Sequence, residues 1–385
     1  MLLVLASILM SVGIVADWIH IRRHKRRGRP VGRWGIAWLA ATDLLPAVIL
    51  LLMVVSRDNG TRIMAVEMWL LWAWIVTVIP RMACYLFRAV GLRRTGYLVA
   101  GALTLLFVWG TTWGRTRLRV NRVEIASERI PAAFDGFRIA QISDLHVGTL
   151  VNPESELRRI ADSINALHPD AVVFTGDLVN IRASELDARM MRLLQRIEAP
   201  VWSVIGNHDV GTYIKDSLRF PAAENLSEVI ARQRQMGWTV LEDTTVYLRR
   251  GTDSISLTGI SFDPALREQR HDRHLPAPQL PEAYAGVPAS LYNITLVHVP
   301  QLWEQIIATG YGDLTLAGHV HSMQMKFRPW GRGWSPAQWL YTRWSGRYDK
   351  GHHTLYINDG TGYVAYPMRL GAWPEITLFT LKRCE

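Results

Sequence analysis

Cysteine is almost absent from this 385-residue chain, which contains only Cys84 and Cys384. The first lies in a largely apolar stretch, and the second is next to the carboxyl terminus. Two cysteines in these places cannot build a disulfide framework or a zinc–thiolate site, and they leave the redox compartment undetermined. Any metal site in the chain must therefore use nitrogen and oxygen ligands.

Acidic residues are scarce in the first third of the chain. Residues 1–122 contain 17 Lys and Arg but only 4 Asp and Glu, whereas the remainder contains 26 and 29, respectively. The net charge of +10 therefore belongs to the segments that flank apolar stretches, and the rest of the chain is mildly acidic. This distribution is typical of a membrane protein, and we expect no specific nucleic-acid partner.

Long apolar runs occur only in this first part, at about residues 2–19, 34–55, 65–80 and 97–113. The run at 34–55 would form a helix of roughly 33 Å, enough to cross a hydrocarbon core of about 30 Å. Tryptophans lie near the ends of the runs, as in the aromatic belts of membrane proteins. We predict an all-α membrane domain of four transmembrane helices at 1–115 and a second domain at 116–385. A buried bundle in a soluble protein would need charged helix faces, which these runs lack.

The basic residues also predict a topology. None precedes the first run, which we interpret as an uncleaved anchor with its amino terminus outside. The first and third loops carry seven and four Lys or Arg and the second carries two, so the first and third loops are predicted to be cytoplasmic. The second domain would then be extracytoplasmic. Four arginines just after the fourth run favour the alternative, a cytoplasmic domain: Arg115, Arg117, Arg119 and Arg122.

From residue 137 onward, strand-like and helix-like segments alternate, which predicts an α/β fold. Helical stripes occur at 153–167 and 186–197, the alternation at 238–260 indicates antiparallel strands, and residues 263–290 suggest a surface loop. Five apolar runs of strand length each end at a polar motif, and they lie at residues 137–142, 171–175, 201–205, 293–297 and 314–317. The motifs are Asp144-Leu145-His146, Gly176-Asp177, Gly206-Asn207-His208-Asp209, His298, and Gly318-His319-Val320-His321. Open α/β sheets place their active groups at the carboxyl ends of strands.

Taken singly, some of these motifs are weak. Asp-x-His is common by chance, and Gly-Asp favours turns. Gly-Asn-His-Asp and Gly-His-x-His are stronger, because their polar side chains are hard to explain by packing. Together the motifs supply enough nitrogen and oxygen ligands for two transition metals. Two such metals can clamp the entering and leaving oxygens of a displacement at phosphorus.

The identity and order of the five motifs resemble the calcineurin-like metallophosphoesterases, and the resemblance covers residues 137 to 382. It implies a β-sandwich flanked by helices and two divalent metal ions, with manganese, iron and zinc suited to the donor set and magnesium less so. Asp144, His146 and His321 would bind the first metal, Asn207, His298 and His319 the second, and Asp177 would bridge them. A metal-bridging hydroxide would attack the phosphorus. Among catalytic residues, His208 would stabilise the phosphoryl oxygens or protonate the leaving group, and Asp209 would orient His208.

Two positions depart from the family pattern without removing a ligand. Many relatives have glycines after the last histidine, where this chain has Ser322-Met323, and many have Asp where this chain has Asn180. The segments 355–360 and 374–378 resemble bacterial membrane-linked phosphoesterases, some of which cleave the pyrophosphate of UDP-diacylglucosamine. Together with the four apolar runs, this resemblance predicts an integral multi-pass protein of the bacterial inner membrane.

Tryptophan and arginine alternate between Phe327 and Tyr348. Such a composition suits a lipid headgroup interface, and we predict that Arg328, Trp330, Trp334 and Trp344 contact lipid or a lipid-linked substrate. Internal packing of the arginines on the tryptophans and binding of single-stranded nucleic acid are the alternatives.

The predicted function is a membrane-anchored phosphoesterase that uses two metals to hydrolyse phosphodiester or pyrophosphate bonds of a lipid-linked substrate at the bilayer. One alternative is a tethered phosphatase or nuclease that acts on soluble phosphoesters. Another is a membrane binding module without catalytic activity.

Overall fold

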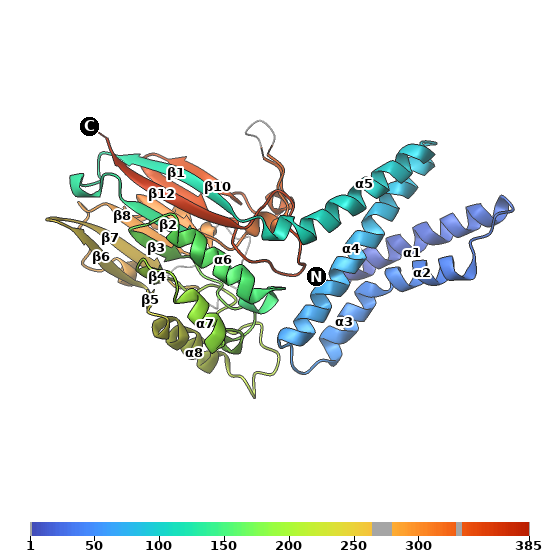
Figure 1. Cartoon of the computed structure of the whole chain (residues 1–385), viewed down its shortest axis with the longest axis horizontal. Helices are drawn as coiled ribbons and strands as arrows, with labels where there is room; N and C mark the ends of the chain where they lie inside the picture. Colours follow the sequence, from blue (N-terminus) through green and yellow to red (C-terminus); the bar gives the residue numbers. More distant parts are fainter. Residues whose placement is uncertain (1, 264–278, 329–332, 385) are drawn as a thin grey trace. The chain divides into compact units, whose positions relative to one another are not determined.

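The computed structural model describes residues 2–263, 279–328 and 333–384, and in the first helix it describes side chains from Met10 onward. The chain divides into two compact units. One contains Met1–Gly114 and Val364–Met368, and the other contains Arg115–Tyr363 and Arg369–Glu385. Figure 1 shows that the first unit is helical and that the second contains the strands.

The described helices of the first unit are α1 (Leu2–Arg26), α2 (Arg33–Asp43), α3 (Leu45–Val55), α4 (Thr61–Ala89) and α5 (Arg93–Thr112). Among the described residues, α4 and α5 are long and apolar enough to cross a membrane, and the bent pair α2–α3 provides a third candidate if it counts as one span. The structure therefore supports two or three candidate spans. The first predicted run, residues 2–19, includes side chains outside the described part of the chain.

The second predicted span is not one straight helix. Helices α2 and α3 meet at Leu44 with a bend of 44°, and Pro46 occupies the first turn of α3. Proline lacks a backbone N–H and clashes with the preceding turn of a continuous helix. At the bend, Arg81 pairs with Asp43 and also lies 3.3 Å from a carboxylate oxygen of Asp17. The apolar run at 34–55 is therefore divided into two helices and does not form the single helix that was predicted.

The second unit contains two six-stranded sheets. The strand order of the first is β1-β12-β2-β3-β4-β5, and that of the second is β10-β11-β9-β8-β7-β6. The first sheet consists of β1 (Arg119–Ser127), β2 (Arg138–Ile142), β3 (Ala171–Phe174), β4 (Val201–Ser203), β5 (Thr239–Val240) and β12 (Glu375–Arg383). The second consists of β6 (Thr244–Arg250), β7 (Asp253–Ile260), β8 (Asn293–Val297), β9 (Leu314–Ala317), β10 (Gly346–Lys350) and β11 (His353–Ile357).

The two sheets pack face to face. Alternate residues of a strand point to opposite faces, and Ile139 and Val173 from the first sheet share one buried cluster with Ile294, Leu296 and Leu316 from the second. The described helices are α6 (Pro153–Asn165), α7 (Ala188–Leu194), α8 (Ala222–Gln235), α9 (Leu280–Ala283) and α10 (Trp303–Ala308). Figure 1 shows α6, α7 and α8 beside the first sheet. This is the mixed α/β fold that the alternation of strands and helices predicted, with the two sheets and flanking helices that the family resemblance implied.

The parallel strands were predicted well, and β8 and β9 have the predicted bounds. The helix at 186–197 is shorter than predicted, because Asp187 caps α7 by accepting hydrogen bonds from the backbone of Arg189 and Met190. Leu186 and Ile197 lie outside the helix but are buried. The predicted loop at 263–290 includes α9, and its residues 264–278 lie outside the described part of the chain.

Candidate metal centre

The predicted metal ligands follow five parallel strands. Asp144 comes after β2, Asp177 after β3 and Asn207 after β4, and these strands are neighbours in the first sheet. His298 follows β8 and His319 follows β9, which are neighbours in the second sheet. The carboxyl ends of these strands thus present polar side chains from both sheets to one site.

Backbone strain is concentrated at this site. Five of the predicted ligands have positive φ angles between 43° and 73°: Asp144, His146, Asp177, His319 and His321. Residues other than glycine rarely adopt this conformation, and clusters of such residues occur at functional sites. Two glycines let the chain approach the carboxylates, because a Cβ on Gly206 would lie 2.2 Å from Oδ1 of Asp177 and one on Gly318 would lie 2.4 Å from Oδ2 of Asp144.

The structure brings together the three side chains predicted for the first metal site. Nε2 of His321 lies 3.1 Å from Nε2 of His146 and 3.1 Å from Oδ1 of Asp144. All three side chains are buried. Burial alone would raise the pKa of Asp144, but the neighbouring imidazole of His321 lowers it below its ordinary value. Burial lowers the pKa of His146 well below its ordinary value, which keeps this ring neutral.

Asp177 lies between the two predicted metal sites. Its Oδ2 is 3.7 Å from Nε2 of His146 and 3.1 Å from Nε2 of His298, while its Oδ1 accepts a hydrogen bond of 2.8 Å from the backbone N–H of His208. Burial would raise the pKa of Asp177, but His298 and His208 hold it well below its ordinary value. An ionised carboxylate in this position can face a cation on either side.

The second predicted site centres on Asn207. Its Oδ1 lies 2.9 Å from Nε2 of His298 and 2.8 Å from Nδ1 of His319. Nδ1 of His298 is 2.8 Å from the carbonyl oxygen of Thr175 and donates to it, so that Nε2 of this ring points into the site. Burial would lower the pKa of His298, but the carboxylate of Asp177 raises it to about 9.

The residues of these sites fit metal ions. Three groups bring their nitrogen and oxygen ligand atoms within 4.8 Å of one another: Asp144, His146 and His321; His146, Asp177 and His208; and Asp177, His298 and His319. The pair His146–His321 brings two ring nitrogens to 3.1 Å, and the pair His298–His319 brings two to 3.3 Å. One proton can form a hydrogen bond between the two nitrogens of only one such pair. A metal cation can instead accept lone pairs from all these nitrogen and oxygen atoms, and its binding to a histidine replaces the proton on that nitrogen.

His208 is held by the protein backbone at one ring nitrogen. Its Nδ1 lies 2.6 Å from the carbonyl oxygen of Asn180, and its ring stacks on Tyr213 at a centroid distance of 4.4 Å. Since a carbonyl oxygen only accepts, Nδ1 carries the proton. Nε2 is therefore the atom of His208 that can exchange a proton with, or hydrogen-bond to, a bound phosphoester.

The hydrogen bonds of Asp209 differ from the predicted contact with His208. Its carboxylate oxygens accept from the backbone N–H groups of Asp177, Leu178, Val179 and Gly206 at 2.9–3.1 Å. The carbonyl of Asn180, and not Asp209, orients the ring of His208. The expected orienting contact is therefore wrong, because Asp209 is committed to the two loops that carry Asp177 and Asn207. Burial raises the pKa of Asp209, and the charge of Asp177 raises it further.

Three supporting residues carry no motif signal in the sequence. Arg369 is fully buried, donates to the carbonyl oxygens of Asp359, Gly362 and Ala372, and places Nη2 3.3 Å from Nδ1 of His321. Glu185 accepts from the backbone of Asn180, Ile181 and Arg182. The hydroxyl of Tyr341 lies 3.4 Å from Nε2 of His319. A single charged or aromatic residue in a loop gives no periodic pattern, so only the folded chain reveals these contacts.

The two departures from the family pattern have structural explanations. Ser322 and Met323 adopt φ angles of 51° and 46° at a place where glycine would be unstrained. The Ser322 hydroxyl donates a hydrogen bond of 2.5 Å to the buried carboxylate of Asp359, which also pairs with Lys326. At Asn180, it is the backbone carbonyl that contacts His208, and any residue supplies this group.

The predicted lipid-facing set is only partly exposed. Trp344 is 8% exposed and belongs to the core of the unit, so its ring cannot face lipid. The guanidinium of Arg328 lies 5.0 Å from the centre of the Trp344 ring and donates to the carbonyl of Ser345. Trp330 lies outside the described part of the chain. Trp334 is exposed, and so are three apolar neighbours that were not predicted: Phe327, Trp339 and Leu340.

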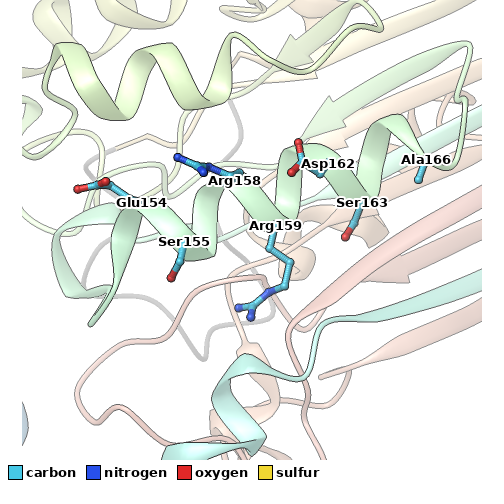
Figure 2. A pocket seen from close by; sticks show the side chains of 7 residues that line it. All are labelled: Glu154, Ser155, Arg158, Arg159, Asp162, Ser163 and Ala166. Atoms are coloured by element: carbon cyan, nitrogen blue, oxygen red, sulfur yellow. The ribbon is translucent and has the colours of Figure 1, made fainter.

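A shallow hollow along α6 is separate from these residues. Figure 2 shows that Glu154, Arg158, Arg159 and Asp162 line it. Its two carboxylates pair with Arg189 and Arg196. None of the predicted metal ligands lines this hollow, and its exposed ion pairs are typical of a solvated helix surface.

Comparison with known proteins identifies the family. The calcineurin-like phosphoesterase family matches residues 137–323. The chain is 33% identical over 299 residues to an uncharacterized metallophosphoesterase, YkuE, of Bacillus subtilis, an alignment that covers 74% of this chain and 94% of that protein. It is 30% identical over 289 residues to a transmembrane protein with metallophosphoesterase domain of Danio rerio, covering 72% of this chain and 61% of that protein.

A shorter match is 34% identical over 131 residues to the UDP-2,3-diacylglucosamine pyrophosphatase LpxG of Chlamydia trachomatis, and it covers 34% of this chain and 40% of that protein. The long match to YkuE covers nearly all of that relative. This chain belongs to the calcineurin-like metallophosphoesterases and is a metal-dependent phosphoric ester hydrolase.

Proposed function

We propose that this protein uses two metal ions to hydrolyse a phosphodiester or pyrophosphate bond in a lipid-linked substrate. The observation that carries the proposal is the position of Asp177, whose Oδ2 faces His146 on one side and His298 on the other. Asp144, His146 and His321 would hold the first metal, and Asn207, His298 and His319 would hold the second. Asp177 would be the shared ligand, since a carboxylate offers two anionic oxygens.

The bound metals supply Lewis acidity and an activated water for attack on phosphorus. The protein residues position the reacting groups and exclude bulk water from them. Asp209 and Gly206 position the loop of Asp177, and the buried ligands exclude bulk water. His208, fixed through Nδ1, uses Nε2 to hydrogen-bond to the phosphoryl group or to pass a proton to the leaving oxygen.

We propose that the first unit anchors the enzyme in a membrane through four spans, with the domain boundary near residue 115. Support comes from the apolar helices α4 and α5 and from the relative whose name describes a transmembrane protein. Arginines near the end of α1 and near the α4–α5 turn line one cavity, as expected if the first and third loops lie on one side. The positive-inside rule makes that side cytoplasmic and, with four spans, places the active site on the extracytoplasmic face of a bacterial inner membrane.

A lipid-linked substrate is the part of the proposal that concerns specificity. A relative is named for cleavage of a diacylated sugar nucleotide. The exposed aromatic surface formed by Phe327, Trp334, Trp339 and Leu340 suits contact with acyl chains or headgroups. These four residues follow His319 and His321 closely in the sequence, so that the surface can form part of the rim of the site.

The test uses the full-length protein, purified in detergent and loaded with Mn²⁺, Fe²⁺ or Zn²⁺. It compares a lipid-linked pyrophosphate, a mononucleotide, single-stranded DNA and a chromogenic phosphodiester. We expect the lipid-linked substrate to have the highest kcat/KM and Asp177→Asn to abolish turnover of every substrate. Preference for the mononucleotide or DNA would instead favour the tethered phosphatase or nuclease. Full activity of Asp177→Asn would refute the metal assignment.

A further inference from the structure

The helical unit contains a small cationic cavity that the phosphoesterase chemistry does not use. It lies between the carboxyl-terminal halves of α1 and α4 and the start of α5, and its volume is about 70 Å³. Its lining contains His20, His24 and Tyr85 but no carboxylate. It also contains four arginines: Arg23, Arg27, Arg88 and Arg93. The cavity is small beside the roughly 300–1,000 Å³ of pockets for whole small molecules, so it suits a single anionic group.

Three of these arginines have no carboxylate partner within the described part of the chain. Arg23, Arg27 and Arg93 are exposed, and none of them pairs with a carboxylate among the residues that the structure describes. The nearby acidic residues Asp17 and Asp43 are both engaged by Arg81. Gathering like charges without a partner is unfavourable. An anion bound among them would remove this repulsion.

The fourth arginine is held in place by neutral groups. Nδ1 of His24 lies 3.3 Å from the carbonyl oxygen of Arg29, and when it donates there its Nε2 accepts a hydrogen bond of 3.1 Å from Nη2 of Arg88. Nη1 of Arg88 donates to the hydroxyl of Tyr97 at 2.9 Å. His20 stacks on Tyr85 at a centroid distance of 4.7 Å and lies 4.5 Å from His24. The guanidinium of Arg88 is thus positioned without losing its positive charge.

The aromatic residues near the cavity are of the kind found at the depth of lipid headgroups. Trp18 on α1 is 51% exposed, with the guanidinium of Arg22 lying 3.8 Å from its ring centre, and Tyr97 on α5 is 61% exposed beside Arg88. Exposed tryptophan and tyrosine at the ends of apolar helices lie at the membrane–water interface. Basic pockets between membrane helices bind anionic headgroups at this depth. The amino-terminal end of α5 adds a favourable helix dipole, although the carboxyl-terminal ends of α1 and α4 oppose it.

We infer that this cavity binds the phosphate group of an anionic lipid and that Arg23, Arg27, Arg88 and Arg93 are its ligands. The site lies in the helical unit and is made only of residues from α1, the loop after it, α4 and α5. It therefore does not depend on the identity of the substrate or of the metals at the catalytic site. Guanidinium groups match phosphate oxygens in geometry as well as in charge.

The experiment measures binding by the shift in thermal unfolding of the full-length protein in detergent, followed by tryptophan fluorescence. A chelator is present throughout, so that the metal centre makes no contribution. The probes are dioctanoyl phosphatidic acid, dioctanoyl phosphatidylcholine and inorganic phosphate. A ligand that binds only the folded protein raises its unfolding temperature with concentration. The variant Arg23→Gln/Arg27→Gln removes two exposed side chains that make no ion pair with any residue the structure describes. Arg57→Gln/Arg62→Gln is the control of equal charge.

We expect phosphatidic acid to stabilise the wild type and the control equally and to bind Arg23→Gln/Arg27→Gln at least tenfold more weakly. Stabilisation by phosphatidic acid alone would identify a lipid headgroup as the source of the phosphate. Equal stabilisation by inorganic phosphate, lost in the same variant, would identify a site for free phosphate. Equal binding of phosphatidylcholine, or of phosphatidic acid by all variants, would refute the inference. If Arg23→Gln/Arg27→Gln fails to fold, Arg93→Gln serves as the second variant under the same criteria.

Discussion

The carboxylate of Asp209 accepts a hydrogen bond of 2.9 Å from the backbone N–H of Asp177, the residue that lies between the two candidate metal sites. The same carboxylate also accepts from Leu178, Val179 and Gly206. A single buried side chain therefore ties together the loops that follow β3 and β4. This relationship makes Asp209 a positioning residue whose effect on the reaction passes through Asp177.

We expect Asp209→Asn to destabilise the protein by about 1–3 kcal/mol, because the new amide group faces backbone donors and leaves them unsatisfied. Activity and metal content should fall together as Asp177 shifts. Thermal unfolding and elemental analysis of the purified protein measure both effects. Asp162→Asn is the control, since Asp162 makes an exposed ion pair with Arg196. Unchanged stability and metal content in Asp209→Asn would contradict the positioning role.

Removal of the metals with a chelator should abolish hydrolysis and lower the unfolding temperature, because the buried carboxylates and imidazoles lose the cations that hold them together. Activity should return on addition of Mn²⁺, Fe²⁺ or Zn²⁺ and less with Mg²⁺, which favours all-oxygen sites. Elemental analysis should find about two metal ions per chain. A reloaded enzyme with one ion per chain and full activity would contradict a dinuclear centre.

His208→Asn should retain both metals but reduce kcat by about 10²–10⁴, the usual contribution of a general acid. If Nε2 of His208 protonates the leaving oxygen, the loss should be large for an alkyl phosphodiester and small for a nitrophenyl ester, whose leaving group needs no proton. Comparison of kcat for the two substrates measures this difference. An equal loss on both would instead indicate that His208 stabilises the phosphoryl oxygens.

Glu185 should make the stability of the protein depend on pH. Burial raises the pKa of Glu185 from its ordinary value of 4.5 to about 7, although the backbone N–H groups of Asn180, Ile181 and Arg182 lower it in part. The folded protein therefore holds this proton more tightly than the unfolded chain. The contribution of Glu185 to the free energy of unfolding is largest below pH 4.5. It falls as the pH rises toward 7, by about 3 kcal/mol in all.

In Glu185→Gln the side chain does not titrate, so the unfolding temperature should change less between pH 5 and pH 7.5 than it does in the wild type. The amide also satisfies fewer backbone donors, which lowers stability at every pH. Glu228→Gln, which removes an exposed partner of Arg232, is the control. Parallel curves for Glu185→Gln and the wild type over this range would rule out Glu185 as the source of the pH dependence.

Trp334→Ala/Trp339→Ala should reduce hydrolysis of a bilayer-embedded substrate by about tenfold or more, because burial of two aromatic rings in lipid contributes several kcal/mol at most to binding. Hydrolysis of a soluble chromogenic ester should stay nearly unchanged. The rings of Trp334 and Trp339 meet edge to face at 5.9 Å and are exposed. Tyr247→Ala removes an exposed aromatic side chain on β6 and serves as the control. Equal losses on both substrates would count against lipid contact.

Local sequence predicted much of the candidate site because its ligands follow short apolar strands. The runs before His298 and His319 form β8 and β9 with the predicted bounds, and Asp144, Asp177 and Asn207 follow β2, β3 and β4. A strand that is buried on both faces has a continuous apolar run, so its end is visible in the sequence. The apolar helices of the first unit were visible for the same reason, although a bend at Leu44 divides the second predicted run into α2 and α3.

Long-range contacts were decided only by the folded chain. The sequence around His208 does not show whether its ring bonds to the carbonyl of Asn180 or to the carboxylate of Asp209. The burial of Trp344 is likewise not visible in a segment rich in tryptophan. The position of β12 between β1 and β2, and of Arg369 beside His321, joins residues more than 40 positions apart. The sequence alone determined which residue types end each strand, because this depends on local hydrophobicity. Tertiary structure decided which of them meet, because that depends on how two sheets pack.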